Sequence, residues 1–186
     1  HGGAATAVLG ISRYLICYYK HLLELLSDPQ HHGMFDAGTR AALARHIPWT
    51  RVVRERRTVL PDGTEGELVP FVREQREQLV LKASSGTHGG QVVLGWNTDR
   101  ETWDRTLRQA LRRAFVVQQR AGAPRETFPV LLDGRPARRS LVWDISPHVW
   151  NDDQLGGFIA RPSPTGLTAF GAGRCIAPVW VIEGRR

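Results

Sequence analysis

The sequence predicts an α+β fold, with helices in its N-terminal part and an antiparallel sheet in its C-terminal part. Three patterns favour this fold: apolar residues at helical spacing before residue 30, a strand–loop–strand near residues 79–96, and short apolar segments separated by turn residues after residue 128. The 186 residues can bury a core, and contents of 41% hydrophobic and 23% charged residues are ordinary for a globular protein.

The N-terminal elements follow from periodicity and from residues that end helices. Apolar side chains recur every three or four positions over about residues 10–27, which predicts an amphipathic helix that ends at Ser27-Asp28-Pro29. A short helix is expected over residues 37–45, with Asp36 as its N-cap. Residues 47–53 should be extended because a proline biases its neighbour away from helix, and residues 61–63 should form a turn.

The central and C-terminal elements are predicted in the same way. Residues 79–82 and 91–96 read as strands joined by a loop. Thr98 and Glu101 form a candidate capping box for the helix that follows, and residues 115–119 form a buried strand. From residue 128 onward we expect four or five antiparallel strands, with turns at 133–134, 151–153 and 165–166.

The basic composition limits the kinds of partner. A net charge of +7 suits nucleic acid, an anionic surface or a polyphosphate ligand. Of the 25 basic residues only Lys20 and Lys82 are lysines, and the other 23 are arginines. A lysine offers a compact point charge where an arginine offers a planar fork. Either a site requires these two ammonium groups, or two surface lysines were retained by chance.

Lys82 lies where a predicted strand meets a loop rich in serine and glycine. Small residues let backbone N–H groups approach phosphate oxygens closely, and a fixed ammonium neutralises phosphate charge. The lysine precedes the glycines, so this loop differs from a P-loop. A plain glycine-rich hairpin with a surface lysine is the alternative. The candidate phosphate-binding residues are Lys82, Ser84, Ser85, Gly86, Gly89 and Gly90.

Other polar residues are weaker candidates. Gln118 and Gln119 end an apolar strand and could offer amides to a base such as adenine, although a strand leaving the core would look the same. Arg161 ends a predicted hairpin and could bind a phosphate in a bidentate manner. Four arginines near one helix could bind nucleic acid, but a solvated helix face explains them better. They are Arg105, Arg108, Arg112 and Arg113.

Taken together, these residues resemble the ATP-grasp nucleotide site, in the order lysine, glycine loop, strand, helix, Gln-Gln strand and antiparallel sheet. The fuller resemblance is to circularly permuted ATP-grasp proteins of the glutathionylspermidine-synthase-like kind. It rests on the segments 20–29 (KHLLELLSDP), 48–51 (PWTR) and 177–181 (APVWV). Both lysines fall where that family contacts ATP phosphates. The chain departs from the family pattern at Ala83, where a proline is common, and at residues 169–175.

The resemblance implies a lobe over residues 1–70, an ATP-binding region over 71–186, and a carboxylate–amine ligase that acts through an acylphosphate. Lys20 and Lys82 would hold phosphates of ATP, residues 84–90 would cover them, Gln118 and Gln119 would line the adenine, and Arg161 would support catalysis. The Mg²⁺ ligands would precede residue 1 of a longer protein, so the piece alone should be inactive. Asp144, Asp152 and Asp153 are the nearest metal candidates here.

The resemblance implies small-molecule or peptide carboxylates and amines as partners. We expect a cytoplasmic location, because the sequence shows neither the pattern of a secretory signal nor a disulfide framework. We expect no membrane span, because no apolar run approaches about 18 residues. The alternative function is a non-catalytic basic module that binds nucleic acid or a partner protein.

Overall fold

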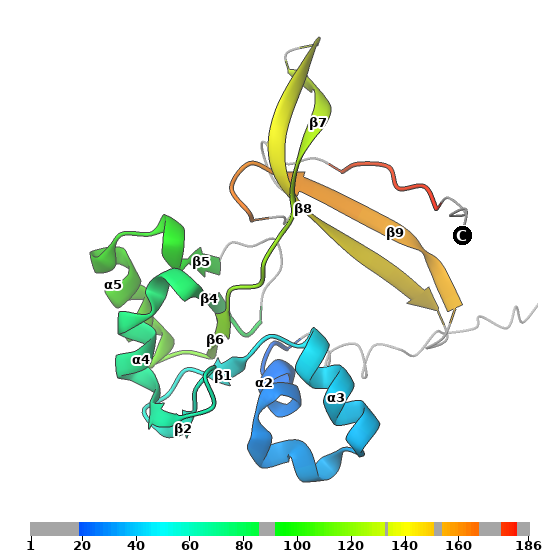
Figure 1. Ribbon diagram of the computed structural model, residues 1–186. Helices are drawn as coiled ribbons and strands as arrows, with labels where there is room; N and C mark the ends of the chain where they lie inside the picture. Colours follow the sequence, from blue (N-terminus) through cyan, green and yellow to red (C-terminus); the bar gives the residue numbers. More distant parts are fainter. Residues whose placement is uncertain (1–18, 86–91, 133, 151–153, 168–175, 182–186) are drawn as a thin grey trace, which may run out of the picture. The chain divides into compact units, whose positions relative to one another are not determined.

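The computed structural model describes residues 19–85, 92–132, 134–150, 154–167 and 176–181 (Figure 1). Its contacts divide the chain into two units, residues 1–121 and 122–186. Both units build antiparallel sheets and the first adds helices, so the predicted mixed α+β class is confirmed. The predicted division after residue 70 differs from this one, because a strand near residue 50 and a strand near residue 117 belong to one sheet.

Two helices and a 3-10 helix form the N-terminal part of the first unit (Figure 1). Helix α2 spans Leu22–Ser27, η1 spans Pro29–Met34 and α3 spans Ala37–His46. Asp36 caps α3 as predicted, since its carboxylate accepts the backbone N–H of Thr39 at 3.0 Å. His31, His32 and Gly33 lie in this 3-10 helix. Residues 10–18 of the helix predicted over 10–27 lie outside the described residues, and α2 ends at Ser27 as predicted.

A four-stranded antiparallel sheet forms the centre of the first unit, in the order β1-β6-β4-β5. The strands are β1 (Thr50–Val52), β4 (Leu79–Ala83), β5 (Val92–Leu94) and β6 (Phe115–Gln119). One face of the sheet packs on α4 (Leu68–Glu74) and α5 (Arg100–Ala110) through a buried apolar cluster. Trp103 is fully buried there, and its indole N–H donates to the carbonyl of Val72 at 3.0 Å.

Local details of this unit correct several predictions. Asp99 rather than Thr98 caps α5, because its carboxylate accepts the backbone N–H of Thr102 at 2.8 Å. The strand expected to reach residue 96 ends at Leu94, where the 3-10 helix η3 (Gly95–Asn97) begins. Strands β2 (Arg57–Val59) and β3 (Glu65–Glu67) form a hairpin, and the predicted turn at its tip holds Gly63 at φ 86°. The 3-10 helix η2 (Arg76–Gln78) leads into β4.

The second unit is a three-stranded antiparallel sheet in the order β7-β8-β9. Its strands are β7 (Arg125–Leu132), β8 (Arg135–Trp150) and β9 (Gln154–Ser163). The long β8 pairs with β7 along its first half and with β9 along its second half. The described residues therefore hold three strands here, where four or five were expected, and a further strand would follow the predicted turn at 165–166, where residues 168–175 lie outside the described residues. Two predicted turns contain Gly134 at φ 76° and Gly166 at φ 83°.

Candidate functional site

Lys82 lies near the end of β4, on the face of the sheet opposite the α4–α5 core. Its neighbours Leu81 and Ala83 point into that core, and side chains alternate along a strand. Lys82 therefore faces the same way as Gln118, which pairs with Val80 across β4 and β6. The ammonium of Lys82 donates a hydrogen bond to Oε1 of Gln118 at 2.6 Å.

A short relay of hydrogen bonds fixes the orientation of Gln118. Nε2 of Gln118 donates to Oγ1 of Thr50 at 2.8 Å, and that hydroxyl donates to the carbonyl of Pro48 at 2.9 Å. Because the proton of Thr50 is directed at Pro48, its oxygen accepts from the Gln118 amide nitrogen. The amide oxygen of Gln118 is then left to face Lys82. The glutamine is buried, with 7% of its surface exposed, so little water competes for the hydrogen bonds of its amide.

Ser84 connects the end of β4 to the turn that precedes α2. Its carbonyl accepts the backbone N–H of Lys20 at 3.1 Å, and its hydroxyl lies 2.8 Å from Nδ1 of His21. Its own N–H donates to the carbonyl of Ala114 at 2.7 Å, and its side chain is fully buried. Ser84 therefore holds Lys20 beside the strand that carries Lys82.

The two lysines interact electrostatically. Burial lowers the pKa of Lys82, and the positive charge of Lys20 lowers it further. Burial also lowers the pKa of Lys20. Among the described residues, Lys82 forms no ion pair with a carboxylate. Two ammonium groups without a matching carboxylate at Lys82 make this end of β4 a place that attracts anions.

A buried polar network joins α2 to β1 in the same unit. Arg51 is fully buried, with Nε 2.8 Å from Oγ1 of Thr58 and 3.3 Å from a carboxylate oxygen of Asp28. Glu24 accepts the backbone N–H of Val52 at 2.9 Å and also pairs with Arg56. This network was not predicted from the sequence. Arg51, next to apolar residues of a predicted extended segment, was its one signal, since a buried arginine requires a partner.

The remaining predicted phosphate-loop residues are only partly described. Ser85 follows β4 and is exposed, while Gly86, Gly89 and Gly90 lie outside the described residues. The two predicted base contacts behave differently from each other. The amide of Gln118 is engaged with Lys82 and Thr50, whereas Gln119 is exposed and points to the opposite face of β6. They therefore do not line one surface together, as a shared adenine site requires.

Arg161 lies in the second unit, on β9, where it faces Asp144 on β8. Its Nε and one terminal nitrogen donate to the two carboxylate oxygens of Asp144 at 3.0 and 2.8 Å, and the latter nitrogen also lies 2.9 Å from Oγ of Ser146. This bidentate pair explains Arg161 as a cross-strand contact of the sheet. It also engages Asp144, one of the three metal candidates; Asp152 and Asp153 lie outside the described residues.

Metal ligands, membrane-spanning helices and exposed arginines of the described chain bear on the other functions that the sequence suggested or excluded. No group of three or more His, Cys, Asp and Glu side chains gathers there in a way that could hold a metal ion. None of the helices in the described ranges combines the length and the apolar character that crossing a membrane takes. Four arginines are exposed on α5 and the turn after it, as a solvated helix face would be. They are Arg105, Arg108, Arg112 and Arg113.

Comparison with known proteins finds no family model that matches this chain and no curated protein that matches it.

Proposed function

We propose that Lys20 and Lys82 bind the phosphate groups of a nucleotide, within an ATP-dependent ligase that joins a carboxylate to an amine. The observation that carries this proposal is the meeting of the two lysines. A chain that places arginine at 23 other positions holds the backbone of Lys20 on Ser84, two residues from Lys82, so that the charge of Lys20 acts on Lys82 at the start of a serine- and glycine-rich loop. Phosphate oxygens would relieve both the repulsion between the lysines and the desolvation of Lys82.

The described residues support distinct tasks in such a site. Lys82 supplies one positive charge, and its hydrogen bond to Gln118 orients the ammonium group. Lys20 supplies a second positive charge, and the carbonyl of Ser84 holds its backbone N–H. Gln118 thus enters the proposal as the residue that orients Lys82, not as a contact of the base. Positioning and charge neutralisation are the main contributions a protein makes to phosphoryl transfer.

The resemblance of the sequence to ATP-grasp proteins supplies the reaction. A substrate carboxylate attacks the γ-phosphate of ATP, and an amine then displaces phosphate from the acylphosphate. Magnesium ions would neutralise the phosphate charge that the two lysines do not. No residue of the described ranges is assigned as a ligand of these ions. Arg161 has no assigned part, because its guanidinium is paired with Asp144.

Calorimetric titration of the full-length protein with Mg-ATP tests the proposal. Lys82→Ala should weaken binding by about 2–4 kcal/mol, as the loss of one partner of a buried charge contact does. Lys20→Arg should weaken it several-fold, because a planar guanidinium does not replace a compact ammonium. Arg108→Ala, at an exposed arginine on α5, is the matched control and should leave the affinity unchanged.

Gln118→Glu probes the orienting role separately. The new carboxylate would lie where Oε1 accepts the Lys82 hydrogen bond at 2.6 Å, and it would neutralise the ammonium. We expect about tenfold weaker ATP binding while the far-ultraviolet circular dichroism spectrum is retained. Equal ATP affinities in wild type, Lys82→Ala and Gln118→Glu would refute the proposal. Polyanion binding lost only with Arg108→Ala would favour the basic-module alternative instead.

A further inference from the structure

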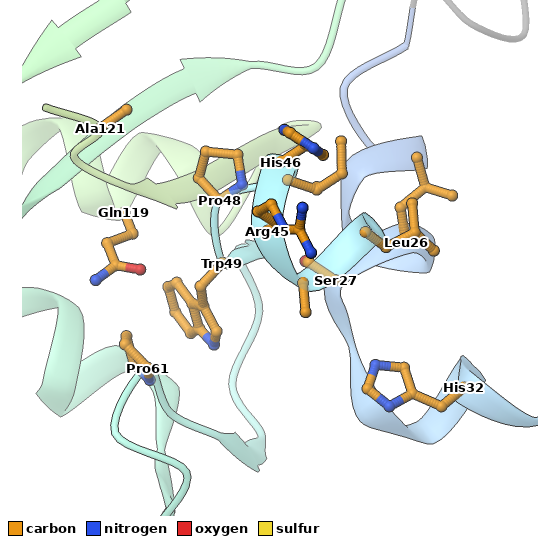
Figure 2. Close-up of a pocket in the computed structure, with 13 residues that line it drawn as sticks. Leu26, Ser27, His32, Arg45, His46, Pro48, Trp49, Pro61, Gln119 and Ala121 are labelled. Carbon is orange, nitrogen blue, oxygen red and sulfur yellow. The ribbon is translucent and has the colours of Figure 1, made fainter. Parts of the chain in front are cut away.

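A pocket of about 430 Å³ lies in the first unit, apart from the lysine pair (Figure 2). Helices α2 and α3 contribute one part of its lining, and the residues around the start of β1 and the end of β6 contribute another. Figure 2 shows Gln119, Trp49 and Pro61 at the left and His32 at the right, with Arg45 between them. None of Lys20, Lys82, Ser84 and Gln118 lines this pocket.

The side of the pocket formed by Trp49 and Gln119 is held in place by bonds within the protein. The indole N–H of Trp49 donates to the carbonyl of Val59 at 2.8 Å, and the guanidinium of Arg51 stacks 5.0 Å from the ring centroid. The backbone N–H of Gln119 donates to the carbonyl of Trp49 at 2.9 Å. The side chain of Gln119 remains exposed and available to a ligand.

The part of the lining on α3 carries the positive charge of Arg45, and two imidazole side chains also line the pocket. Arg45 and His46 lie in the last turn of α3, and His32 lies in η1. No aspartate or glutamate lines the pocket, and in the described part of the chain the Arg45 guanidinium has no hydrogen bond or ion pair. The attraction for anions comes from the side chains, because a helix C-terminus itself carries a partial negative charge.

We propose that this pocket binds a small organic carboxylate with an apolar body. The apolar body would pack against Trp49 and Leu26, the carboxylate would pair with Arg45 in a bidentate manner, and the Gln119 amide would add a hydrogen bond. Pockets of this volume commonly hold small molecules. A phosphate ion lacks the apolar body, and the charge of Arg45 repels a cation. The proposal does not depend on nucleotide binding at the lysine pair.

Backbone amide chemical shifts of the full chain, titrated with benzoate to about 20 mM, test this site. Saturable shifts should centre on residues 43–49 and on Gln119. The neutral isostere benzamide should bind at least about fivefold more weakly, and inorganic phosphate should not reproduce the shifts. Benzoate shifts that map elsewhere, do not saturate or are matched by benzamide would overturn the proposal.

Two exposed arginines provide matched variants for the same titration. Arg45→Gln removes the proposed carboxylate partner and should weaken benzoate binding by about fivefold or more. Arg108→Gln removes an exposed arginine of α5 outside the pocket and should leave binding unchanged. Both side chains are exposed, so both proteins should fold, and the spectrum of each variant shows directly whether it has. Equal benzoate affinities of Arg45→Gln and wild type would also overturn the proposal.

Discussion

Lys82→Met tests the lysine pair through the pH dependence of stability, without any ligand. Burial and the charge of Lys20 hold the pKa of folded Lys82 below its ordinary value of 10.5. The unfolded chain has no such environment, so between the two pKa values it binds more protons than the folded chain. The free energy of unfolding must then rise with pH across that window. Below the window both states are protonated, and Lys82 adds no slope.

The size of the effect has a physical bound. A full difference of one bound proton changes the free energy of unfolding by about 1.4 kcal/mol per pH unit. Lys20 adds slope of the same sign, since burial lowers its pKa too. In Lys82→Met only the contribution of Lys20 remains. The slope for wild type should therefore exceed that for the variant by up to about 1.4 kcal/mol per pH unit.

Urea unfolding followed by tryptophan fluorescence between about pH 7.5 and 10 measures both slopes. Tyrosines and cysteines titrate in this range as well, but both proteins contain the same ones, so the difference between the two curves cancels them. The methionine also removes the donor to Gln118, which shifts the whole curve of the variant. A difference between the curves that is constant with pH, or that falls with pH, would refute the assignment.

Two further predictions concern the framework around the site. Asp99→Ala should cost about 1 kcal/mol of stability by chemical unfolding, because Asp99 caps α5, whereas Glu101→Ala should stay within about 0.5 kcal/mol. A larger cost for Glu101→Ala than for Asp99→Ala would favour the predicted capping box of Thr98 and Glu101 instead. Arg51→Met should cost about 3–5 kcal/mol, because Asp28 stays buried without its cation. The exposed Arg54→Met should cost less than about 1 kcal/mol, and equal costs for the two variants would contradict this explanation.

The sequence predicted elements whose signals are local. Asp36 before α3, the apolar side of α5 and the strand 115–119 each depend on residues a few positions apart, and all are confirmed. Helix α4 was missed because it is short, contains Pro70 and owes its place to the burial of Leu68 and Val72. The capping residue of α5 was misplaced by one position, because Thr98 donates its hydroxyl to the carbonyl of Leu94 and leaves Asp99 to cap the helix.

The candidate site was likewise predicted from the sequence only where its signals are local. Composition and the loop singled out Lys20 and Lys82, and the structure brings the two lysines together. The contact of His21 with Ser84 and the relay from Gln118 through Thr50 join segments far apart in sequence, which no periodicity encodes. The opposite directions of Gln118 and Gln119 could have been foreseen, because neighbouring residues of a strand alternate between faces. Nucleotide binding itself stays a prediction.

The relay that holds Lys82 has a consequence for when a ligand can bind. Its members come from β1, from β4 and from β6, and Ser84 at the end of β4 holds the turn before α2, so long loops must close before these segments meet. A chain that has formed only its N-terminal helices, or that has lost β6 by local unfolding, cannot hold the ammonium groups in place. The anion binding proposed for the two lysines would thereby be confined to the native state, and a saturating anion would raise the melting temperature by mass action.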